Sequence, residues 1–354
     1  MREYTILVGS YAPAQAQGIH LFRLRADPLR LEPAGGQSGI SNPSYLAASA
    51  DGSLVYAVME DMEFDGQFGG GAAAFRRRGD RLEPLDRLPT GGTLPCHLLL
   101  DEPNRALYVS NYLSGSLSMF RLAADGSLAG RTDLDRHAGH GPNPDRQEGP
   151  HAHFAGFAPD GRGLYCVDLG LDRLCLYAPD PASGRLCRQP QGDIALPGGA
   201  GPRHFAVLPG RPGWLYVVCE LSSEVYAVEQ TADGGRIAGR VSTLAGDVPG
   251  STCAAIKASP DGRFLYASNR GDDSIAVIAA GPQPGGLALM QRQPTGGRNP
   301  RDLLVLEDLV LAANQDGGGI TGFARDPKTG LLSGPVLQAD CPQPVCLVAC
   351  GGEA

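Results

Sequence analysis

Apolar and polar positions recur along the chain in a single repeated pattern. Each copy has a leading segment, a short apolar strand, a turn that contains glycine, and a second apolar strand that ends in a polar pair. The second strands align on Leu7, Tyr56, Tyr108, Tyr165, Tyr216, Tyr266 and Leu311, which are 49, 52, 57, 51, 50 and 45 residues apart. Strand-like runs of Val, Ile, Leu and Tyr, joined by Gly turns at this period, are typical of a four-stranded propeller blade.

The repeats add up to a closed ring. Six copies are complete, and they begin at Asn42, Leu94, Gly149, Gly201, Ser251 and Asn299. The seventh is divided between the chain ends, with its first strand in PQPVCLVAC and its next two strands in TILVGSY and GIHLFRL. A blade built from both ends leaves no open sheet edge at the seam. The sequence therefore predicts an all-β fold: a seven-bladed β-propeller with four-stranded antiparallel blades, as a single domain over residues 1–354.

Two segments interrupt the repeat and are expected to be loops. Residues 61–71 are rich in glycine and are expected to be flexible, and residues 137–150 are rich in polar groups. Helical spacing of apolar residues is scarce, which disfavours a doubly wound α/β fold.

Composition and charge narrow the classes of partner. Hydrophobic residues make up 42% of the chain and charged residues 19%, which is ordinary for a globular protein. The formal net charge of −8 disfavours a nucleic acid or an anionic membrane surface, because both require a broad positive surface. An anionic small molecule remains possible where a few Arg residues converge, and we expect a monomer or a weak homo-oligomer.

The chain ends and the cysteines bear on localisation. The opening MREYTILVGSY has the features of neither a secretory signal nor a membrane anchor, so no membrane association is expected. Nine Cys residues without a CxxC pair are interpreted as small buried thiols in a reducing environment. The expected location is therefore cytoplasmic.

Polar residues gather at two places in each repeat. In an up-and-down blade the strands run antiparallel, so the start of the first strand and the end of the second lie on one face of the ring. The leading segments supply His97, His151, His153, Arg203, His204 and Arg301. The ends of the second strands supply Glu60, Asn111, Asp168, Glu220, Asn269, Arg270, Asn314 and Gln315. The sequence therefore predicts a polar site at one mouth of the central channel.

Two histidines raise the question of a metal. In the extended segment GPHAHF, His151 and His153 project to the same side because side chains alternate along a strand. A metal pair is conceivable, but a third ligand at fixed spacing is missing from the sequence. Hydrogen-bonding or acid–base chemistry is favoured for these residues, and neither a metal nor another cofactor is expected.

Five fragments carry a family resemblance that spans nearly the whole chain. They are GPNPDRQEGPHAH, VDLGLDR, GPRH followed by ELSS, SPDGRFLYASNRG, and NPRD followed by NQD. In this order they resemble the seven-bladed lactonase family of 6-phosphogluconolactonases, to which the fungal carboxy-muconate lactonizing enzyme is similar. The resemblance implies a cytosolic enzyme without a metal that hydrolyses 6-phosphoglucono-δ-lactone in the pentose phosphate route.

The resemblance also implies roles for residues. The family's catalytic His corresponds to His153 or to His151, its paired Arg residues to Arg203 and Arg270, and its acid to Glu220. The family usually has Asn before that acid, whereas this chain has Cys219, which is expected to remove a polar group from the rim.

The expected mechanism follows from these residue types. His153, with Glu220, deprotonates a water that attacks the lactone carbonyl, while Arg203 and Arg270 bind the oxyanion or the phosphate. Further substrate-binding candidates are Arg301, Asp168, Asn269, Gln315 and His204. For Asp168 and Asn269 the alternative is a structural role, in which the side chain caps a turn or bonds a neighbouring blade.

Two other functions fit the same residues. One is a cycloisomerase or a lactonase for another carboxylated or sugar lactone, which a substrate panel would separate from the first. The other is a propeller that binds a protein partner without catalysis, since a fold alone does not fix function.

Overall fold

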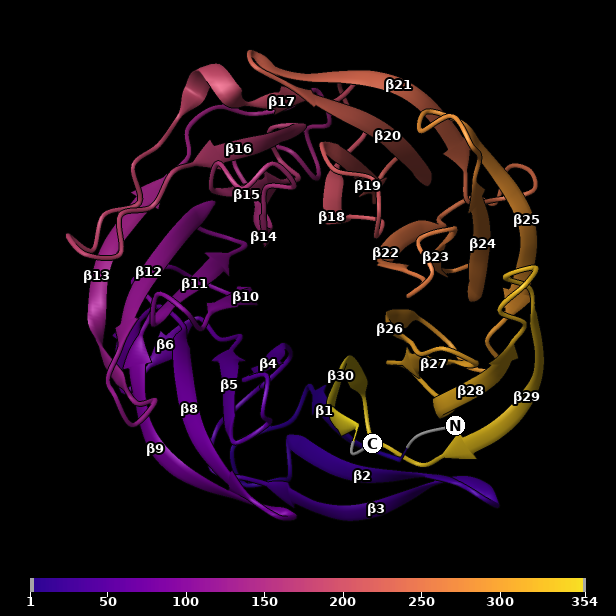
Figure 1. Cartoon of the computed structure of the whole chain (residues 1–354). Helices are drawn as coiled ribbons and strands as arrows, with labels where there is room; N and C mark the ends of the chain where they lie inside the picture. The colour runs from indigo at the N-terminus through magenta and orange to yellow at the C-terminus, as the bar shows by residue number, and fades with distance from the viewer. Residues whose placement is uncertain (1–2, 353–354) are drawn as a thin grey trace.

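Seven four-stranded sheets are arranged as blades around a central axis (Figure 1). The computed structural model describes residues 3–352. Blade 1 consists of β4 (Leu46–Ala48), β5 (Leu54–Met59), β8 (Gly71–Arg78) and β9 (Arg81–Pro89). Blade 2 consists of β10 (Pro95–Asp101), β11 (Ala106–Asn111), β12 (Ser116–Leu122) and β13 (Leu128–Arg136). Blade 3 consists of β14 (Ala152–Phe157), β15 (Leu164–Asp168), β16 (Arg173–Tyr177) and β17 (Ile194–Ala195).

The remaining blades follow in chain order. Blade 4 consists of β18 (Pro202–Ala206), β19 (Trp214–Cys219), β20 (Glu224–Thr231) and β21 (Gly234–Ser242). Blade 5 consists of β22 (Thr252–Ala258), β23 (Phe264–Arg270), β24 (Ser274–Ala280) and β25 (Leu287–Pro294). Blade 6 consists of β26 (Pro300–Val305), β27 (Leu309–Asn314), β28 (Gly319–Arg325) and β29 (Leu332–Ala339). The predicted seven-bladed, four-stranded propeller is confirmed.

Blade 7 closes the ring with strands from both ends of the chain. Its order is β30 (Pro344–Gly352), β1 (Tyr4–Ser10), β2 (Ile19–Ala26) and β3 (Leu29–Gln37), and β30 is the innermost strand. The antiparallel pairing of β1 with β30 runs from Tyr4 opposite Gly352 to Ser10 opposite Pro344. The predicted closure is therefore confirmed, and it gives β1 the same inner neighbour that the second strand has in every other blade.

Apolar side chains fill the spaces between neighbouring blades. The aligned Tyr residues of blades 1 to 5 are almost fully buried, and each packs into a cluster that includes the next blade, as Tyr56 does with Leu107 and Val109. Some of their hydroxyl groups also form hydrogen bonds: Tyr56 donates to the Gly126 carbonyl at 2.8 Å and Tyr266 to the Gly330 carbonyl at 2.7 Å. The repeated Tyr therefore joins blades both by apolar packing and by a hydrogen bond.

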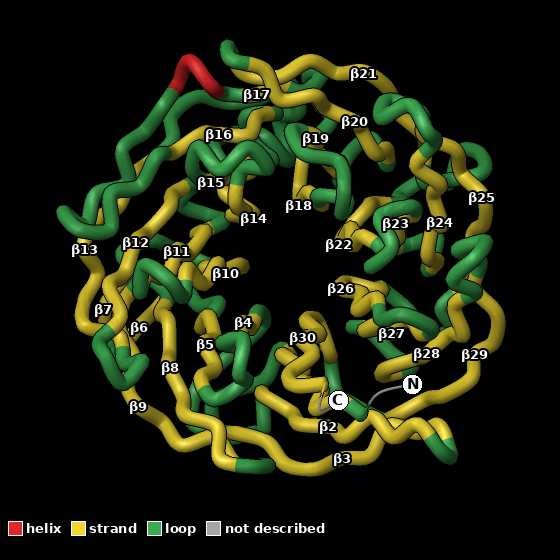
Figure 2. Tube along the Cα trace, viewed as in Figure 1, coloured by secondary structure: helices red, strands yellow, loops and turns green. Residues whose placement is uncertain are grey.

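The two interruptions differ from each other. The segment expected to be a flexible loop contains a hairpin of β6 (Glu63–Phe64) and β7 (Gln67–Phe68), turned by Asp65 and Gly66 at φ of 49° and 78°. An Asp-Gly pair with both φ positive is a favoured two-residue hairpin turn, so the sequence carried a signal for it. Residues 137–150 are irregular, as Figure 2 shows.

Helical structure within residues 3–352 is confined to one short 3-10 turn, η1 (Pro190–Gly192), drawn in red in Figure 2. In that part of the chain there is no helix with the length and hydropathy needed to cross a lipid bilayer.

Candidate active site

A β-bulge in the innermost strand of five blades leaves one residue unpaired and directed to the channel. In blade 3, for example, Ala152 pairs with Asp168 and Phe154 with Val167, so His153 has no opposite residue. The same register shift leaves four more residues unpaired, namely Cys96, Arg203, Arg301 and Val345. A bulge re-aims a side chain and is common beside active sites.

These bulge residues line one pocket. The central pocket is lined by Ser44, Tyr45, Glu60, Cys96, His153, Arg203, His204, Arg301, Asp302 and Val345. Every one of the five bulge residues is in this set, and Ser44 follows Pro43 in blade 1 as Cys96, Arg203 and Arg301 follow Pro in theirs. Residues of six blades thus contribute to a single pocket.

The residues that follow the bulges form an aromatic floor. The rings of Tyr45 and His97, and those of His97 and Phe154, have centroids 4.2 Å apart, and Phe154 and His204 are 4.8 Å apart. Burial lowers the pKa of His97 and of His204 well below the usual range, and nearby cations add to this effect. His204, expected to bind substrate, therefore reaches the pocket as a neutral ring at its base.

One residue at the end of each second strand belongs to a set that we call the rim. These residues are Tyr11, Glu60, Tyr112, Leu169, Glu220, Arg270 and Gln315. Six of them directly follow the last residue of their strand, as Tyr112 follows Asn111 and Glu220 follows Cys219, whereas Arg270 is itself the last residue of β23 and pairs with Thr252. Because side chains alternate along a strand, the rim residue and the residue before it point to opposite sides.

Glu220 is surrounded by three arginines. Its carboxylate lies 3.1 Å from Arg203 Nε, 2.8 Å from an Arg270 terminal nitrogen and 2.5 Å from one of Arg146. Burial alone would raise the pKa of Glu220, but Arg270, Arg203 and Arg146 outweigh it and lower the pKa to about 2. Glu220 is therefore ionised at neutral pH and balances the charge of one of the three cations.

Arg146 was missed by the sequence analysis. It lies in the irregular segment 137–150, its side chain is 39% exposed, and it also contacts the Tyr112 hydroxyl at 3.5 Å. The segment lies outside the repeat, so the alignment of blades could not place this residue. The motif DRQE, which the resemblance already used, was the available signal.

His153 is a neutral base beside these cations. Burial lowers its pKa well below the usual range, and Arg203, Arg301 and Arg270 lower it further. Its ring stands edge-on to His204 at 5.3 Å, and among residues 3–352 its Nδ1 has no hydrogen-bonding partner. The pKa of Arg203 is lowered by the same kinds of effect. Burial and the neighbouring Arg270 and Arg301 lower it to about 10, so Arg203 is still protonated at neutral pH.

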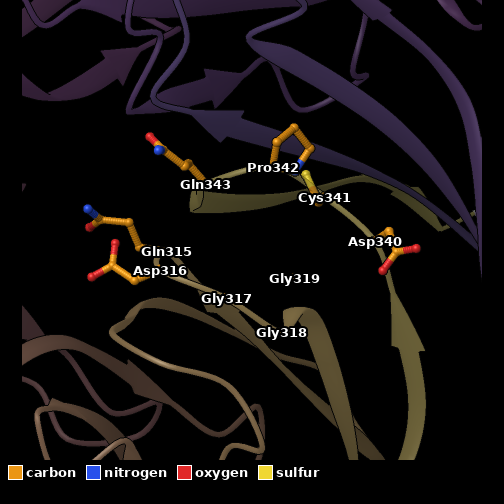
Figure 3. Close-up of a pocket in the computed structure, with 9 residues that line it drawn as sticks. All are labelled: Gln315, Asp316, Gly317, Gly318, Gly319, Asp340, Cys341, Pro342 and Gln343. Atoms are coloured by element: carbon orange, nitrogen blue, oxygen red, sulfur yellow. The ribbon is translucent and has the colours of Figure 1, made fainter.

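Another part of the pocket wall brings Arg301 and a second carboxylate, Glu60, to the same tyrosine, Tyr11. The Tyr11 hydroxyl donates to Glu60 Oε2 at 2.9 Å, and Ser44 donates to the same oxygen. Arg301 lies over the Tyr11 ring at 5.4 Å and contacts Gln315 Oε1 at 3.4 Å. Gln315 also edges a surface groove at the seam of blades 6 and 7, where Figure 3 shows it across from Gln343.

Asp168 and Asn269 are not brought to the pocket. Both are fully buried one position before the rim. Asp168 accepts the backbone N–H of His151 at 2.8 Å and of Leu171 at 3.0 Å, and its other oxygen is 2.5 Å from His137 Nδ1. Asn269 donates to Ser274 Oγ at 3.1 Å and to the Thr243 carbonyl at 3.2 Å. The structure thus gives both the structural role that the sequence analysis held as the alternative.

Cys219 occupies this same inner position in blade 4. It is fully buried in an apolar cluster with Val217 and Tyr226. The expectation that it removes a polar group from the rim needs correction, because the position points away from the rim. Glu220 keeps its arginine contacts beside it.

His151 lies at the edge of the pocket. Its ring stacks on Tyr112 with centroids 4.6 Å apart, and Nε2 is 3.2 Å from Glu148. The His153 ring is edge-on to the same Tyr112 ring, with centroids 5.5 Å apart. Within residues 3–352, no group of three or more His, Cys, Asp or Glu side chains is arranged to hold a metal ion.

Known proteins share this architecture. A family model described as a lactonase with a 7-bladed beta-propeller matches residues 5–349. A 6-phosphogluconolactonase of Bacillus subtilis is 35% identical over 354 aligned positions, covering 98% of each chain, and one of Formosa agariphila is 30% identical, covering 92% of this chain and 94% of its own. The solved structure of the periplasmic gluconolactonase of Pseudomonas aeruginosa superposes with a TM-score of 0.91 at 28% identity, covering 99% of this chain and all of its own.

Proposed function

The chain belongs to the family of seven-bladed β-propeller lactonases, and from this premise we propose that it hydrolyses 6-phosphoglucono-δ-lactone to 6-phosphogluconate. The observation that carries the choice of an anionic lactone is the cluster of Arg146, Arg203 and Arg270 around a single ionised Glu220. Three cations and one carboxylate leave a net positive charge in a protein whose overall charge is −8. A phosphorylated substrate would complement that local charge.

The arginines divide by exposure. Arg146 and Arg270 have side chains 39% and 15% exposed, which places them within reach of a phosphate that enters from solvent. Arg203 is 3% exposed and lies at a bulge position as His153 does. In our proposal Arg203 stabilises the oxyanion that forms on the lactone carbonyl, where a fixed donor in a dry site is worth about a hundredfold to a thousandfold in rate.

His153 orients the attacking water in this proposal. A neutral imidazole donates a hydrogen bond from one ring nitrogen and accepts one at the other. Its buried Nδ1 is free to take such a bond, and burial together with the charges of Arg203, Arg301 and Arg270 lowers its pKa and keeps the ring neutral. Glu220 holds the arginines in place and is unsuited to accept a proton, since its pKa is about 2.

The test is kinetic. Purified protein with freshly prepared 6-phosphogluconolactone should release acid faster than the spontaneous reaction, as followed by titration at constant pH. His153→Ala and Arg203→Lys should lower kcat/KM at least about tenfold. His140→Ala is the matched control, because this exposed His lies in segment 137–150, just before the strand that carries His153, and should leave the rate unchanged. Absence of acceleration by the native protein would overturn the proposal.

Unphosphorylated glucono-δ-lactone provides the comparison of substrates. The Pseudomonas aeruginosa relative is described as a gluconolactonase, which makes the sugar lactone a necessary second substrate. Our proposal requires a kcat/KM for the phosphorylated lactone at least about tenfold higher, because each well-formed contact of Arg with phosphate contributes about 1.4 kcal/mol or more. Equal kcat/KM values for the two lactones would show that the arginines do not recognise the phosphate, and only the assignment as a lactone hydrolase would remain.

We place the enzyme in the cytoplasm, where its product would enter the pentose phosphate pathway. All nine cysteines are free thiols and eight of them are buried. Such a set is compatible with a reducing compartment. Fractionation of the cells that make the protein tests this assignment directly.

A further inference from the structure

Glu60 has the same place in blade 1 that Glu220 has in blade 4. Glu60 directly follows Met59, the last residue of β5, and Glu220 directly follows Cys219, the last residue of β19. Glu60 and Arg203 both line the central pocket, and Glu220 contacts Arg203 at 3.1 Å. Their immediate partners differ, however. Glu220 meets three guanidinium groups, whereas Glu60 meets the hydroxyl groups of Tyr11 and Ser44.

The hydrogen bonds of Glu60 leave one of its oxygens available. Tyr11 and Ser44 both donate to Oε2, so they fix the plane of the carboxylate. Among residues 3–352, both side-chain hydrogen bonds to the Glu60 carboxylate go to Oε2, and none goes to Oε1. Glu60 also lines the central pocket together with His153 and Arg301. The free oxygen therefore belongs to a carboxylate held rigidly at the wall of the pocket that also contains the neutral imidazole.

We propose that Glu60 is the general base that takes the proton from the attacking water. The inference rests on the proposed lactone hydrolysis and extends it. The water oxygen forms a bond to the carbonyl carbon, its proton passes to Glu60 Oε1, and the carbonyl π electrons move to the oxygen that Arg203 stabilises. The oxyanion then collapses and breaks the bond between that carbon and the ring oxygen. The ring oxygen takes the proton from Glu60, which restores the carboxylate and leaves an acid and a hydroxyl group.

The surroundings of the three candidate bases favour Glu60. Burial raises the pKa of Glu60 above its usual value, and Arg301, Ser44 and Tyr11 reduce that rise without cancelling it. The Glu220 pKa of about 2 and the strongly lowered pKa of His153 make both weak proton acceptors. Two carboxylates whose environments separate their pKa values take different parts in acid–base chemistry. Glu60 accepts the proton and Glu220 stays ionised to hold the arginines.

The first test replaces the carboxylate without changing its shape. Glu60→Gln should lower kcat about a hundredfold, a usual loss for a missing general base, with KM within about threefold. The decline of kcat toward acidic pH, present in the native protein, should disappear in the variant. Glu63→Gln, at a nearby exposed residue in the β6–β7 hairpin, is the control and should behave as the native protein does. Melting curves establish that each variant is folded.

Two further variants separate proton transfer from a structural effect. Tyr11→Phe removes a hydrogen bond that favours the charged carboxylate, so the acidic limb of the kcat profile should move to higher pH. Glu60→Ala should regain activity when formate is added, because formate can occupy the vacated space and accept the proton. A folded Glu60→Gln variant with the native kcat and pH profile would overturn the inference. An inactive native protein would instead overturn the proposed hydrolysis, so the two failures are distinguishable.

Discussion

At the scale of single residues, the pocket is governed by how each buried charge is balanced. Glu220 and Arg203 are both almost fully buried, and the desolvation of either one alone would cost several kcal/mol. The three arginines around Glu220 offset that cost and hold the carboxylate ionised. Two of these arginines, Arg203 and Arg270, also act on His153: burial lowers its pKa most, and Arg203, Arg301 and Arg270 lower it further, so the ring stays neutral. Burial and shared cations therefore set the charge state of the ionic cluster and of the imidazole next to it.

Glu220→Gln should make the protein less stable in a way that depends on pH. The pKa of Glu220 is lowered from 4.5 to about 2, so its ionic pairing stabilises the folded protein fully above pH 4.5 and is lost as the pH falls toward 2. We expect a loss of about 3 kcal/mol near pH 7, measured by urea unfolding. The difference from the native protein should shrink steadily between pH 4.5 and the lowest pH at which folding persists.

Glu83→Gln is the matched control for this measurement. Glu83 pairs with Arg78 on the surface, where the two side chains are 53% and 65% exposed. Such exposed pairs contribute about 0.5 kcal/mol, so little change is expected at any pH. A Glu220→Gln penalty that stays constant from pH 7 to pH 3 would contradict the role given to the buried cluster.

Arg146→Ala should weaken substrate binding more than it slows chemistry. The side chain is half-exposed and reaches Glu220 from an irregular segment, so it can contact a phosphate without taking part in carbonyl addition. We expect KM for the phosphorylated lactone to rise about tenfold, equivalent to about 1.4 kcal/mol, with kcat within about threefold. Arg185→Ala, at an exposed Arg that faces Asp133, should leave both constants unchanged. A fall in kcat alone would assign Arg146 to the reaction centre instead.

At the scale of elements, one residue of strand register decides which polar groups reach the pocket. The sequence repeat correctly brought Arg203, Glu220 and Arg270 together, because the period fixes where each second strand ends. The period alone does not show which of the two polar residues at the end of a second strand faces the pocket. Asp168 and Asn269 are the first members and point away, whereas Glu220 and Arg270 are the second and point inward.

The β-bulges explain why the observed placement of the two histidines differs from the one that the sequence predicted. In a regular strand His151 and His153 would share one face, which is how the sequence analysis treated them. The bulge at His153 changes this geometry, so that His153 lines the pocket while His151 stacks on Tyr112 at its edge. Hydrophobic periodicity does not record an extra residue in a strand of five or six. The position of Pro immediately before most bulge residues is the signal that could have revealed it.

Asp168→Ala should loosen the segment that carries Arg146. Asp168 accepts the backbone N–H of His151 and contacts His137, so it fastens the segment 137–150 at its two ends. We expect trypsin to cleave after Arg146 about tenfold faster in the variant, because exposure of a cleavage site follows local opening. Cleavage is measured by mass spectrometry over time.

Asn269→Ala is the control for this cleavage experiment. Asn269 occupies the equivalent inner position in blade 5 and bonds Ser274, so its loss removes a comparable buried polar group without touching segment 137–150. The control should leave cleavage after Arg146 at the native rate. Equal acceleration in both variants would mean that general destabilisation, and not the tether at Asp168, controls the segment.

At the scale of the whole molecule, the pocket exists only because the ring is closed. Six blades supply its side chains, and Val345 from β30 is one of them. Strand β30 also packs Leu347 against Ile6 and Val8, and Cys346 against Leu7. Closure therefore connects the two chain ends both to the apolar core and to the site. The closed ring also brings together in one pocket side chains that lie up to about 300 residues apart in sequence.

A chain that ends at residue 343 should lose stability and activity together. It lacks β30, so β1 exposes an unpaired edge and the apolar residues beneath it lose their cover. We expect the melting temperature to fall by about 10 °C or more, or the protein to aggregate, as measured by calorimetry. A peptide of residues 342–354 should restore both properties in a concentration-dependent manner, because binding to the folded form stabilises it by mass action.

Deletion of residues 63–68 is the comparison for this truncation. It removes the β6–β7 hairpin, whose ends are already joined by a hydrogen bond of 2.9 Å from the Gly69 N–H to the Met62 carbonyl, and it leaves all seven four-stranded sheets whole. Such a deletion should lower the melting temperature by only about 2–4 °C. If the truncated chain instead melted at the native temperature and kept its activity, the closing strand would not be required. The shared blade would then be an accessory to a ring that is stable with its innermost strand missing.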